Sequence, residues 1–125
     1  MRELKFRVWS DFWEKYADFE AELYMDGSID ADFEDDNGIP HHETTDLVIE
    51  QYTGLKDKNG KEIYEGDIVD DGYHICKIRW SEHFAAFEAV NENDNYVSNI
   101  WFESKYGKVI GSIHENPELL EQEQE

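Results

Sequence analysis

Carboxylates are the side chains of this sequence with the greatest capacity for chemistry. Thirty-one Asp and Glu residues stand against eleven Lys and Arg, which gives a formal net charge of −20. Residues 16–55 hold twelve of these acids and neither Lys nor Arg. Within that stretch, five closely spaced acids form the candidate acidic interaction surface: Asp30, Asp32, Glu34, Asp35 and Asp36. On a β-strand, acids two residues apart project from one face at a spacing of about 6.5–7 Å.

Such rows of carboxylates have two interpretations, and the sequence leaves both open. Duplex DNA carries one charge per about 1.7 Å of axis, or about 3.4 Å per strand, so two or three rows present a comparable charge density. The protein would then act as a decoy that occupies a basic, DNA-binding host protein through charge complementarity. In the other interpretation, the acids form a solvated surface that promotes solubility.

Two features of the acidic stretch bear on metal binding. The spacing of Asp30, Asp32 and Glu34 partly matches a calcium loop, but Asp35 and His41 occupy the positions that require Gly and Glu. In His41-His42-Glu43, adjacent histidines cannot easily point at one ion, and no third ligand stands at motif spacing. We therefore expect no dedicated metal site and no cofactor.

Catalytic motifs are missing from the sequence. There is no nucleophile elbow around a Ser and no Gly-rich phosphate loop. With 31 acids, close carboxylate pairs are expected by chance, so they carry no glycosidase signal. Cys76 lies in an alternating pattern that is typical of a buried, inert thiol. We predict no catalytic residues and a protein that is not an enzyme.

The charge balance and the cysteine count exclude further classes. Nucleic acid and anionic membranes require clustered basic residues, so neither is expected as a direct partner. A single cysteine rules out an internal disulfide framework, and the N-terminus has no apolar signal region. We expect a cytoplasmic protein.

The elements that position these side chains are mainly strands. Residues 4–9 alternate with period two, and residues 47–52 form a second strand. Asn59-Gly60, between apolar flanks, predicts a tight type I′ hairpin with positive φ at both residues. Gly66-Asp67 supplies another turn. Further strands are predicted over residues 67–70, 73–80, 84–90, 96–102 and 108–114.

Two regions are less regular. Residues 11–17 are predicted as a helical turn, followed by a hairpin centred on Asp26-Gly27-Ser28, although a single helix over residues 12–24 fits nearly as well. Residues 34–46 have turn formers and no periodicity, which predicts a mobile loop. At the other end, Asn116 caps a helix that starts with Pro117, and residues 121–125 are expected to fray.

Three blocks of the sequence resemble the YopX-like family of phage and prophage proteins of Gram-positive bacteria. They are Arg2-Glu3 with Lys5-Phe6-Arg7-Val8-Trp9, residues 51–69, and residues 109–120. The resemblance implies an SH3-like barrel, self-association and a phage origin, and it brings no known activity. Residues 10–46 are more acidic than the family leads us to expect. Ser112-Ile113-His114 also stands where the family has Asn-Ile-Tyr.

Together these observations predict a mainly β fold, a small SH3-like barrel with an appended hairpin or loop region and a short C-terminal helix. We expect one domain over residues 1–125: a variable acidic region at 10–46, a barrel core at 47–114 completed by strand 4–9, and a helix with tail at 116–125. Trp9, Trp80 and Trp101 would fill the core or a subunit interface. The expected function is a non-enzymatic, homo-oligomeric interaction module, with the DNA-mimic decoy as the alternative.

Overall fold

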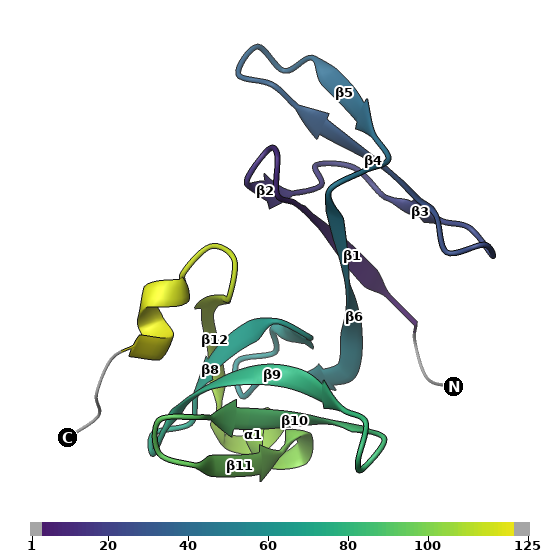
Figure 1. Ribbon diagram of the computed structural model, residues 1–125. Helices are drawn as coiled ribbons and strands as arrows, with labels where there is room; N and C mark the ends of the chain where they lie inside the picture. Colours follow the sequence, from purple (N-terminus) through teal and green to yellow (C-terminus); the bar gives the residue numbers. More distant parts are fainter. Residues whose placement is uncertain (1–3, 122–125) are drawn as a thin grey trace. The chain divides into compact units, whose positions relative to one another are not determined.

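The computed structural model describes residues 4–121 and divides the chain into two compact units (Figure 1). Unit 1 combines Met1–Lys5 with Gln51–Glu125, and unit 2 is Phe6–Glu50. Strands dominate both units, so the predicted mainly β fold is confirmed. The one α-helix of the described residues has seven residues, and none of the described helices has the length and apolarity needed to cross a membrane.

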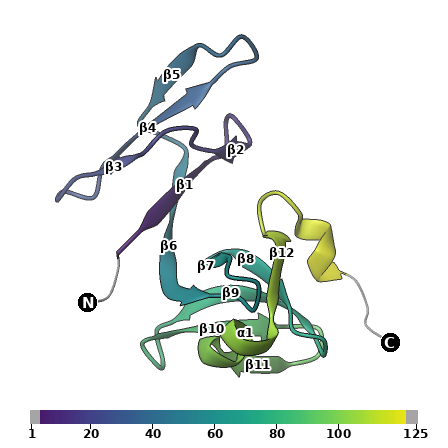
Figure 2. The same cartoon turned by 180° about the vertical axis from the view of Figure 1, so that it is seen from behind.

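Unit 1 contains an antiparallel five-stranded sheet that curls over a short helix, α1 (Ile100–Tyr106) (Figure 2). The strand order is β11-β10-β9-β8-β12, with each neighbouring pair antiparallel. The strands are β8 (Asp67–Asp70), β9 (Ile75–Ser81), β10 (Ala86–Asn91), β11 (Tyr96–Asn99) and β12 (Lys108–Ser112). Four of the five strands predicted after residue 66 are therefore confirmed. Of the fifth, predicted over residues 96–102, only residues 96–99 form a strand.

The core of unit 1 lies on one face of this sheet. Cys76 and Ile78 alternate along β9 as predicted, and Ile78 pairs with Ala89 on β10. Ile63 and Val69 complete the buried cluster, while side chains of α1, β11 and β12 pack against it from outside. The period-two pattern of residues 73–80 therefore places the core face correctly.

The hairpin at Asn59-Gly60 forms, but its predicted type I′ geometry is wrong. It joins β6 (Leu47–Lys56) to β7 (Glu62–Tyr64). Gly60 alone has a positive φ in this turn, at 85°. A side-chain oxygen of Asp57 accepts hydrogen bonds from the backbone N–H groups of Asn59 and Lys61, both at 2.9 Å. This Asp holds a longer, five-residue turn in place of the two-residue one.

Unit 2 is built from short strands and has no α-helix among its described residues. The strands are β1 (Phe6–Ser10), β2 (Lys15–Tyr16), β3 (Glu22–Leu23), β4 (Ile29–Glu34), β5 (Pro40–Glu43) and the first residues of β6. The alternative helix at 12–24 is wrong, and the helical turn predicted at residues 11–17 is cut to a single turn. The Glu14 N–H donates to the Ser10 carbonyl at 2.8 Å, and β2 begins at Lys15. The hairpin at Asp26-Gly27-Ser28 is confirmed by the pairing of β3 with β4. Val8, Ala31 and Phe33 form the core.

The loop predicted over residues 34–46 is also wrong, because β5 pairs with β4 as a hairpin. An Asp side chain accepts backbone N–H groups in the β4–β5 turn, as Asp57 does in the turn at residues 57–61. Asp35 Oδ1 accepts the N–H groups of Asn37 and Ile39 at 2.9 and 3.0 Å, and Gly38 has φ 77°. Asp-x-Asn-Gly occurs in both turns, so the same local hydrogen bonding recurs in each.

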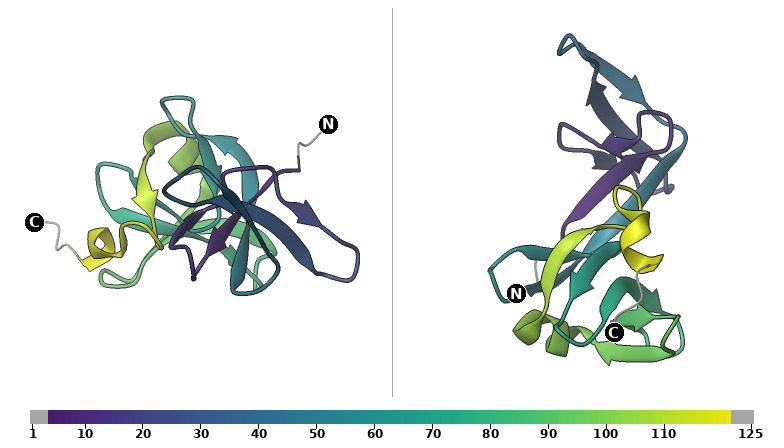
Figure 3. Two further views of the ribbon diagram at one scale, coloured as in Figure 1. Left: turned by 90° about the horizontal axis from the view of Figure 1, so that it is seen from above. Right: turned by 90° about the vertical axis from the view of Figure 1, so that its left-hand side faces the viewer.

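Two predictions near the C-terminus need correction. The strand predicted over residues 96–102 ends at Asn99, whose side chain accepts the Phe102 N–H at 2.8 Å and caps α1. The helix after Asn116 forms as a 3₁₀ helix, η1 (Pro117–Glu121), which follows β12 (Figure 3). Asn116 does not cap it with its side chain, which accepts the N–H of Ser112 instead. Residues 122–125 of the predicted frayed tail lie outside the described residues.

Candidate functional site

The outer face of β4 carries three of the five predicted acidic residues. Asp30, Asp32 and Glu34 alternate with Ala31 and Phe33, which are buried in the core of unit 2. The carboxylates therefore project from one face, as the alternation predicted. The neighbouring strand β3 adds Glu22, which stands opposite Asp30 in the register.

A histidine interrupts this acidic row. His42 of β5 is paired in register with Asp32. Its Nδ1 lies 3.1 Å from Asp32 Oδ1, and its Nε2 lies 3.3 Å from Asp30 Oδ1. Both ring nitrogens can donate at once only in the imidazolium form. The hydrogen bond with Asp32, aided by the charge of Asp30, raises the pKa of His42 above 6.5.

The other two predicted acids lie in the β4–β5 turn. Asp35 accepts two backbone N–H groups of that turn, and its Oδ2 lies 2.9 Å from Nε2 of His41. Its carboxylate is therefore committed to holding the hairpin together. Asp36 is exposed at the tip of the turn. The five acids thus separate into a row of three, a residue that shapes the turn, and one solvated charge.

The negative charge is unevenly divided between the units. Phe6–Glu50 contains fourteen acids and two bases, a net charge of −12. The remaining 80 residues, which belong to unit 1, contain seventeen acids and nine bases, a net charge of −8. Unit 2 therefore has the higher charge density by a factor of nearly three.

Unit 1 presents a different kind of surface at the end of the β9–β10 hairpin. The row of Ile78 and Ala89 is buried, but the next row on the same face pairs Trp80 with Phe87, and Trp80 is 45% exposed. These two rings meet edge to face with their centroids 5.1 Å apart. Phe84, in the hairpin turn, is 72% exposed. We call Trp80, Phe84 and Phe87 the aromatic end.

The three tryptophans selected from the sequence have different environments. Trp9 is buried, and its Nε1–H donates to Asp11 at 3.1 Å. Trp80 and Trp101 are each about half exposed, the latter on the first turn of α1. Core packing therefore accounts for one of them and leaves two at the surface.

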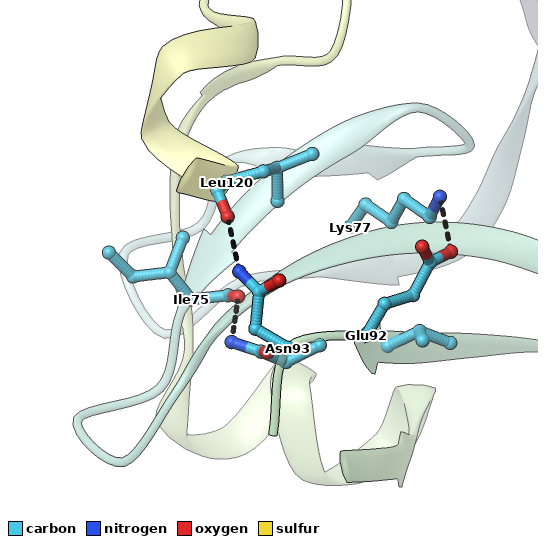
Figure 4. A pocket seen from close by; sticks show the side chains of 7 residues that line it. Ile75, Lys77, Glu92, Asn93 and Leu120 are labelled. Carbon is cyan, nitrogen blue, oxygen red and sulfur yellow. Dashed lines mark hydrogen bonds and ion pairs between the residues drawn. The ribbon is translucent and has the colours of Figure 1, made fainter. Parts of the chain in front are cut away.

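A small pocket lies on the other face of the sheet, under η1 (Figure 4). It is lined by residues of β9, β10 and the following turn, together with Leu120, whose carbonyl accepts a hydrogen bond from the Asn93 side chain at 3.1 Å. Lys77 and Glu92 form an ion pair of 2.8 Å at its rim. Its volume of about 80 Å³ is well below the several hundred Å³ of a typical ligand site. The pocket is therefore too small for a drug-sized ligand.

A buried polar cluster lies within the core of unit 1. One ligand-type atom each from Asp71, Cys76 and Glu103 falls within 4.8 Å of the other two, and all three residues are buried. Burial raises the pKa of Glu103 to about 8, and the neighbouring Asp71 carboxylate adds to the shift. Burial likewise raises the pKa of the Cys76 thiol to about 12, in agreement with the predicted inert thiol.

Sequence reasoning found the acidic row and missed the other two features. The aromatic end depends on the register that pairs Trp80 with Phe87, and the buried cluster unites residues from a turn, a strand and a helix. No short motif links positions 71, 76 and 103. The one available signal was Trp80 at the end of an alternating strand.

The fold and these surfaces define a small, acidic, mainly β protein of two units. The model of the YopX protein family matches residues 5–121, so the chain belongs to the YopX family. It is similar to protein EF1440 from Enterococcus faecalis, with 28% identity, a TM-score of 0.65 and coverage of 96% of this chain and 99% of that one. Protein yopX from Bacillus subtilis has the same fold at 20% identity, with a TM-score of 0.60 and coverage of 95% and 98%. None of the curated proteins matches the chain.

Proposed function

We propose that the protein is a non-enzymatic interaction module that associates with copies of itself through the aromatic end of unit 1. The observation that carries the proposal is that the apolar face of β9 and β10 extends beyond the buried core and is exposed at the end of the hairpin. Ile78 and Ala89 are buried, whereas Trp80 in the next row is half exposed and Phe84 is more so. Aromatic side chains are enriched in protein–protein interfaces.

The charge distribution supports this choice of surface. Two copies that each carry −20 repel one another, so a contact forms most readily where the local charge is low. Unit 1 has the lower charge density, and near its aromatic end Arg79 lies 3.4 Å from Glu88, which offsets that carboxylate. An apolar contact at this position gains from burial of the rings while adding little repulsion.

A pair of matched substitutions tests the proposal. Phe84→Ser removes an aromatic ring from the aromatic end, and Tyr73→Ser removes an equally exposed ring (71%) at the opposite end of β9. In sedimentation velocity, we expect Phe84→Ser to weaken self-association at least about tenfold, as for an interface hot spot. Tyr73→Ser should leave it unchanged. A wild-type chain that stays monomeric, or equal effects of the two substitutions, would refute the proposal.

A second candidate function rests on the row formed by Asp30, Asp32 and Glu34. A decoy for a basic, DNA-binding host protein needs carboxylates at a regular spacing on one face, and this row supplies them. The net charge of −12 in unit 2 adds an electrostatic field that would steer a basic partner towards it. In this function the protein would compete with DNA without binding DNA itself.

Charge reversal separates the decoy from the interaction module. Replacing Asp30, Asp32 and Glu34 by Lys should abolish capture of a basic partner from bacterial lysate at about 50 mM salt, and wild-type capture should fall steeply by about 200 mM. Replacing the exposed Glu82, Glu115 and Glu118 by Lys makes the same change in net charge in unit 1. Capture that survives the first substitution, or that both substitutions reduce equally, would rule out a specific decoy surface.

The biological setting belongs to the same proposal. The family resemblance implies a phage or prophage origin and an SH3-like closure of the unit 1 sheet, and the single cysteine favours a reducing cytoplasm. We accordingly propose an accessory protein of the phage cycle that acts on protein partners in the bacterial host.

A further inference from the structure

We propose that Asp71, Cys76 and Glu103 form a zinc site in the core of unit 1. The three residues come from different elements: the turn after β8, strand β9 and helix α1, which packs under the sheet (Figure 2). One potential ligand atom from each lies within 4.8 Å of the other two. A zinc ion drawn between them would bridge the sheet and the helix that covers it.

Unpartnered oxygens point to a missing ligand. Glu103 is fully buried, and neither of its carboxylate oxygens has a hydrogen-bond partner within the described residues 4–121. The nearby Ser98 hydroxyl donates instead to the Asn99 carbonyl, at 3.3 Å. Oδ2 of Asp71 is likewise buried and unpartnered. Buried polar atoms without partners are rare and costly, so a cation or a proton is required between these groups.

The surroundings hold the ligands in place. Oδ1 of Asp71 accepts the backbone N–H groups of Tyr73 and His74 at 2.8 and 2.7 Å, which fixes the carboxylate and leaves Oδ2 free. Gly107 makes room for Glu103, because a Cβ at this position would lie 2.8 Å from Oε2. Outer hydrogen bonds of this kind orient the ligands of metal sites.

The donor set selects the metal. A thiolate beside two carboxylates suits Zn²⁺, which accepts sulfur and oxygen ligands in a tetrahedral site, whereas Ca²⁺ and Mg²⁺ prefer oxygen alone. Binding requires loss of the Cys76 proton and ionisation of Glu103, both of which the ion drives by its charge. Three protein ligands leave one coordination position for water or another donor.

Because the site is buried, the chain should acquire zinc as it folds. The full-length chain is therefore unfolded, refolded with Zn²⁺ or with a chelator, separated from free metal, and analysed for bound zinc. Refolding with Co²⁺ adds a spectroscopic readout, since a thiolate ligand gives a charge-transfer band in the near ultraviolet. We expect about one zinc ion per chain, a higher melting temperature with zinc, and a cobalt–thiolate band.

Variants assign the ion to this cluster. Cys76→Ser and Glu103→Gln should each lower zinc affinity at least about tenfold. His42→Ala, which removes the imidazole beside two surface carboxylates, should leave it unchanged. If Cys76→Ser fails to fold, the cobalt–thiolate band of the wild type tests the site instead, because Cys76 is the single cysteine of the chain.

Wild-type protein that refolds without zinc, shows no thiolate band, or loses zinc through His42→Ala would overturn the proposal. In that case a proton shared between Glu103 and Asp71 would occupy the site. The outcome is independent of self-association, which is measured at the aromatic end.

Discussion

Single aspartates shape this protein more than its total charge suggests. Asp57 and Asp35 occupy equivalent positions in two Asp-x-Asn-Gly turns, and each accepts two backbone N–H groups of its own turn. Asp57 differs because it is buried and its second oxygen accepts the Val109 N–H of β12 at 2.8 Å. It therefore joins a turn to a strand some fifty residues away, as well as closing its own hairpin.

Replacing the two aspartates should reveal this difference. We expect Asp57→Asn to lower the free energy of unfolding by about 1.5–3 kcal/mol, the range for hydrogen bonds to a charged group. Asp35→Asn should cost less, because its carboxylate is less buried and binds Asn37, Ile39 and His41 of its own hairpin. Urea unfolding of the two variants measures the difference. Equal losses would show that the bond to Val109 contributes nothing.

The Asp57 contribution should also depend on pH. Burial alone acts to raise the pKa of Asp57, but the N–H groups of Val109, Lys61 and Asn59 outweigh it and hold the pKa below 3.8. The stabilisation is therefore fully present above pH 3.8 and is lost as pH falls through the lower, folded-state value. The gap in unfolding free energy between wild type and Asp57→Asn should accordingly narrow on acidification.

His42 offers a second test at the residue scale. Because its ring lies between Asp32 and Asp30, we expect an NMR titration to give a pKa above 6.5. Asp32→Asn removes the largest cause of the shift and should return the pKa towards 6.5. Any stabilisation from this contact is present below pH 6.5 and is lost as pH rises through the folded-state value. A pKa insensitive to Asp32→Asn would mean that the pair does not form in solution.

Among the elements, α1 shows how a local cap can outweigh strand propensity. Residues 96–102 are rich in aromatic and β-branched types, which favour a strand, yet the chain turns into a helix at Asn99. We expect Asn99→Ala to lower the free energy of unfolding by about 1 kcal/mol, and Asn99→Ser, which retains a capping hydroxyl, to cost much less. Thermal unfolding of both variants checks this. If Asn99→Ala and Asn99→Ser lower the free energy of unfolding equally, the side-chain cap does not stabilise α1.

Sequence patterns predicted the strands of unit 1 well and those of unit 2 poorly. The period-two alternation of residues 73–80 placed the core face, because β9 is long enough to express it. Strand β5 was missed because its residues, Pro40, His41, His42 and Glu43, have low β-propensity and owe their pairing to the Asp35 turn. Comparison of residues 35–38 with residues 57–60 would have revealed that hairpin.

At the scale of the whole molecule, the sequence predicted the mainly β fold and the family. Three blocks carried the resemblance, and the match over residues 5–121 confirms it. The aromatic end and the buried cluster were beyond prediction, since both depend on strand register and on a helix that the sequence did not indicate. Asp30, Asp32 and Glu34 were predictable because a single strand defines their common face.

The response of self-association to salt tests the account most directly. Two copies of charge −20 repel, and salt screens this repulsion while leaving an apolar contact intact. Sedimentation equilibrium of the wild type between about 50 and about 500 mM NaCl, where the screening length shortens from over 10 Å to about 4 Å, should therefore show a dissociation constant that falls as salt rises. A dissociation constant that rises with salt, or a chain that remains monomeric throughout, would contradict an apolar interface at the aromatic end.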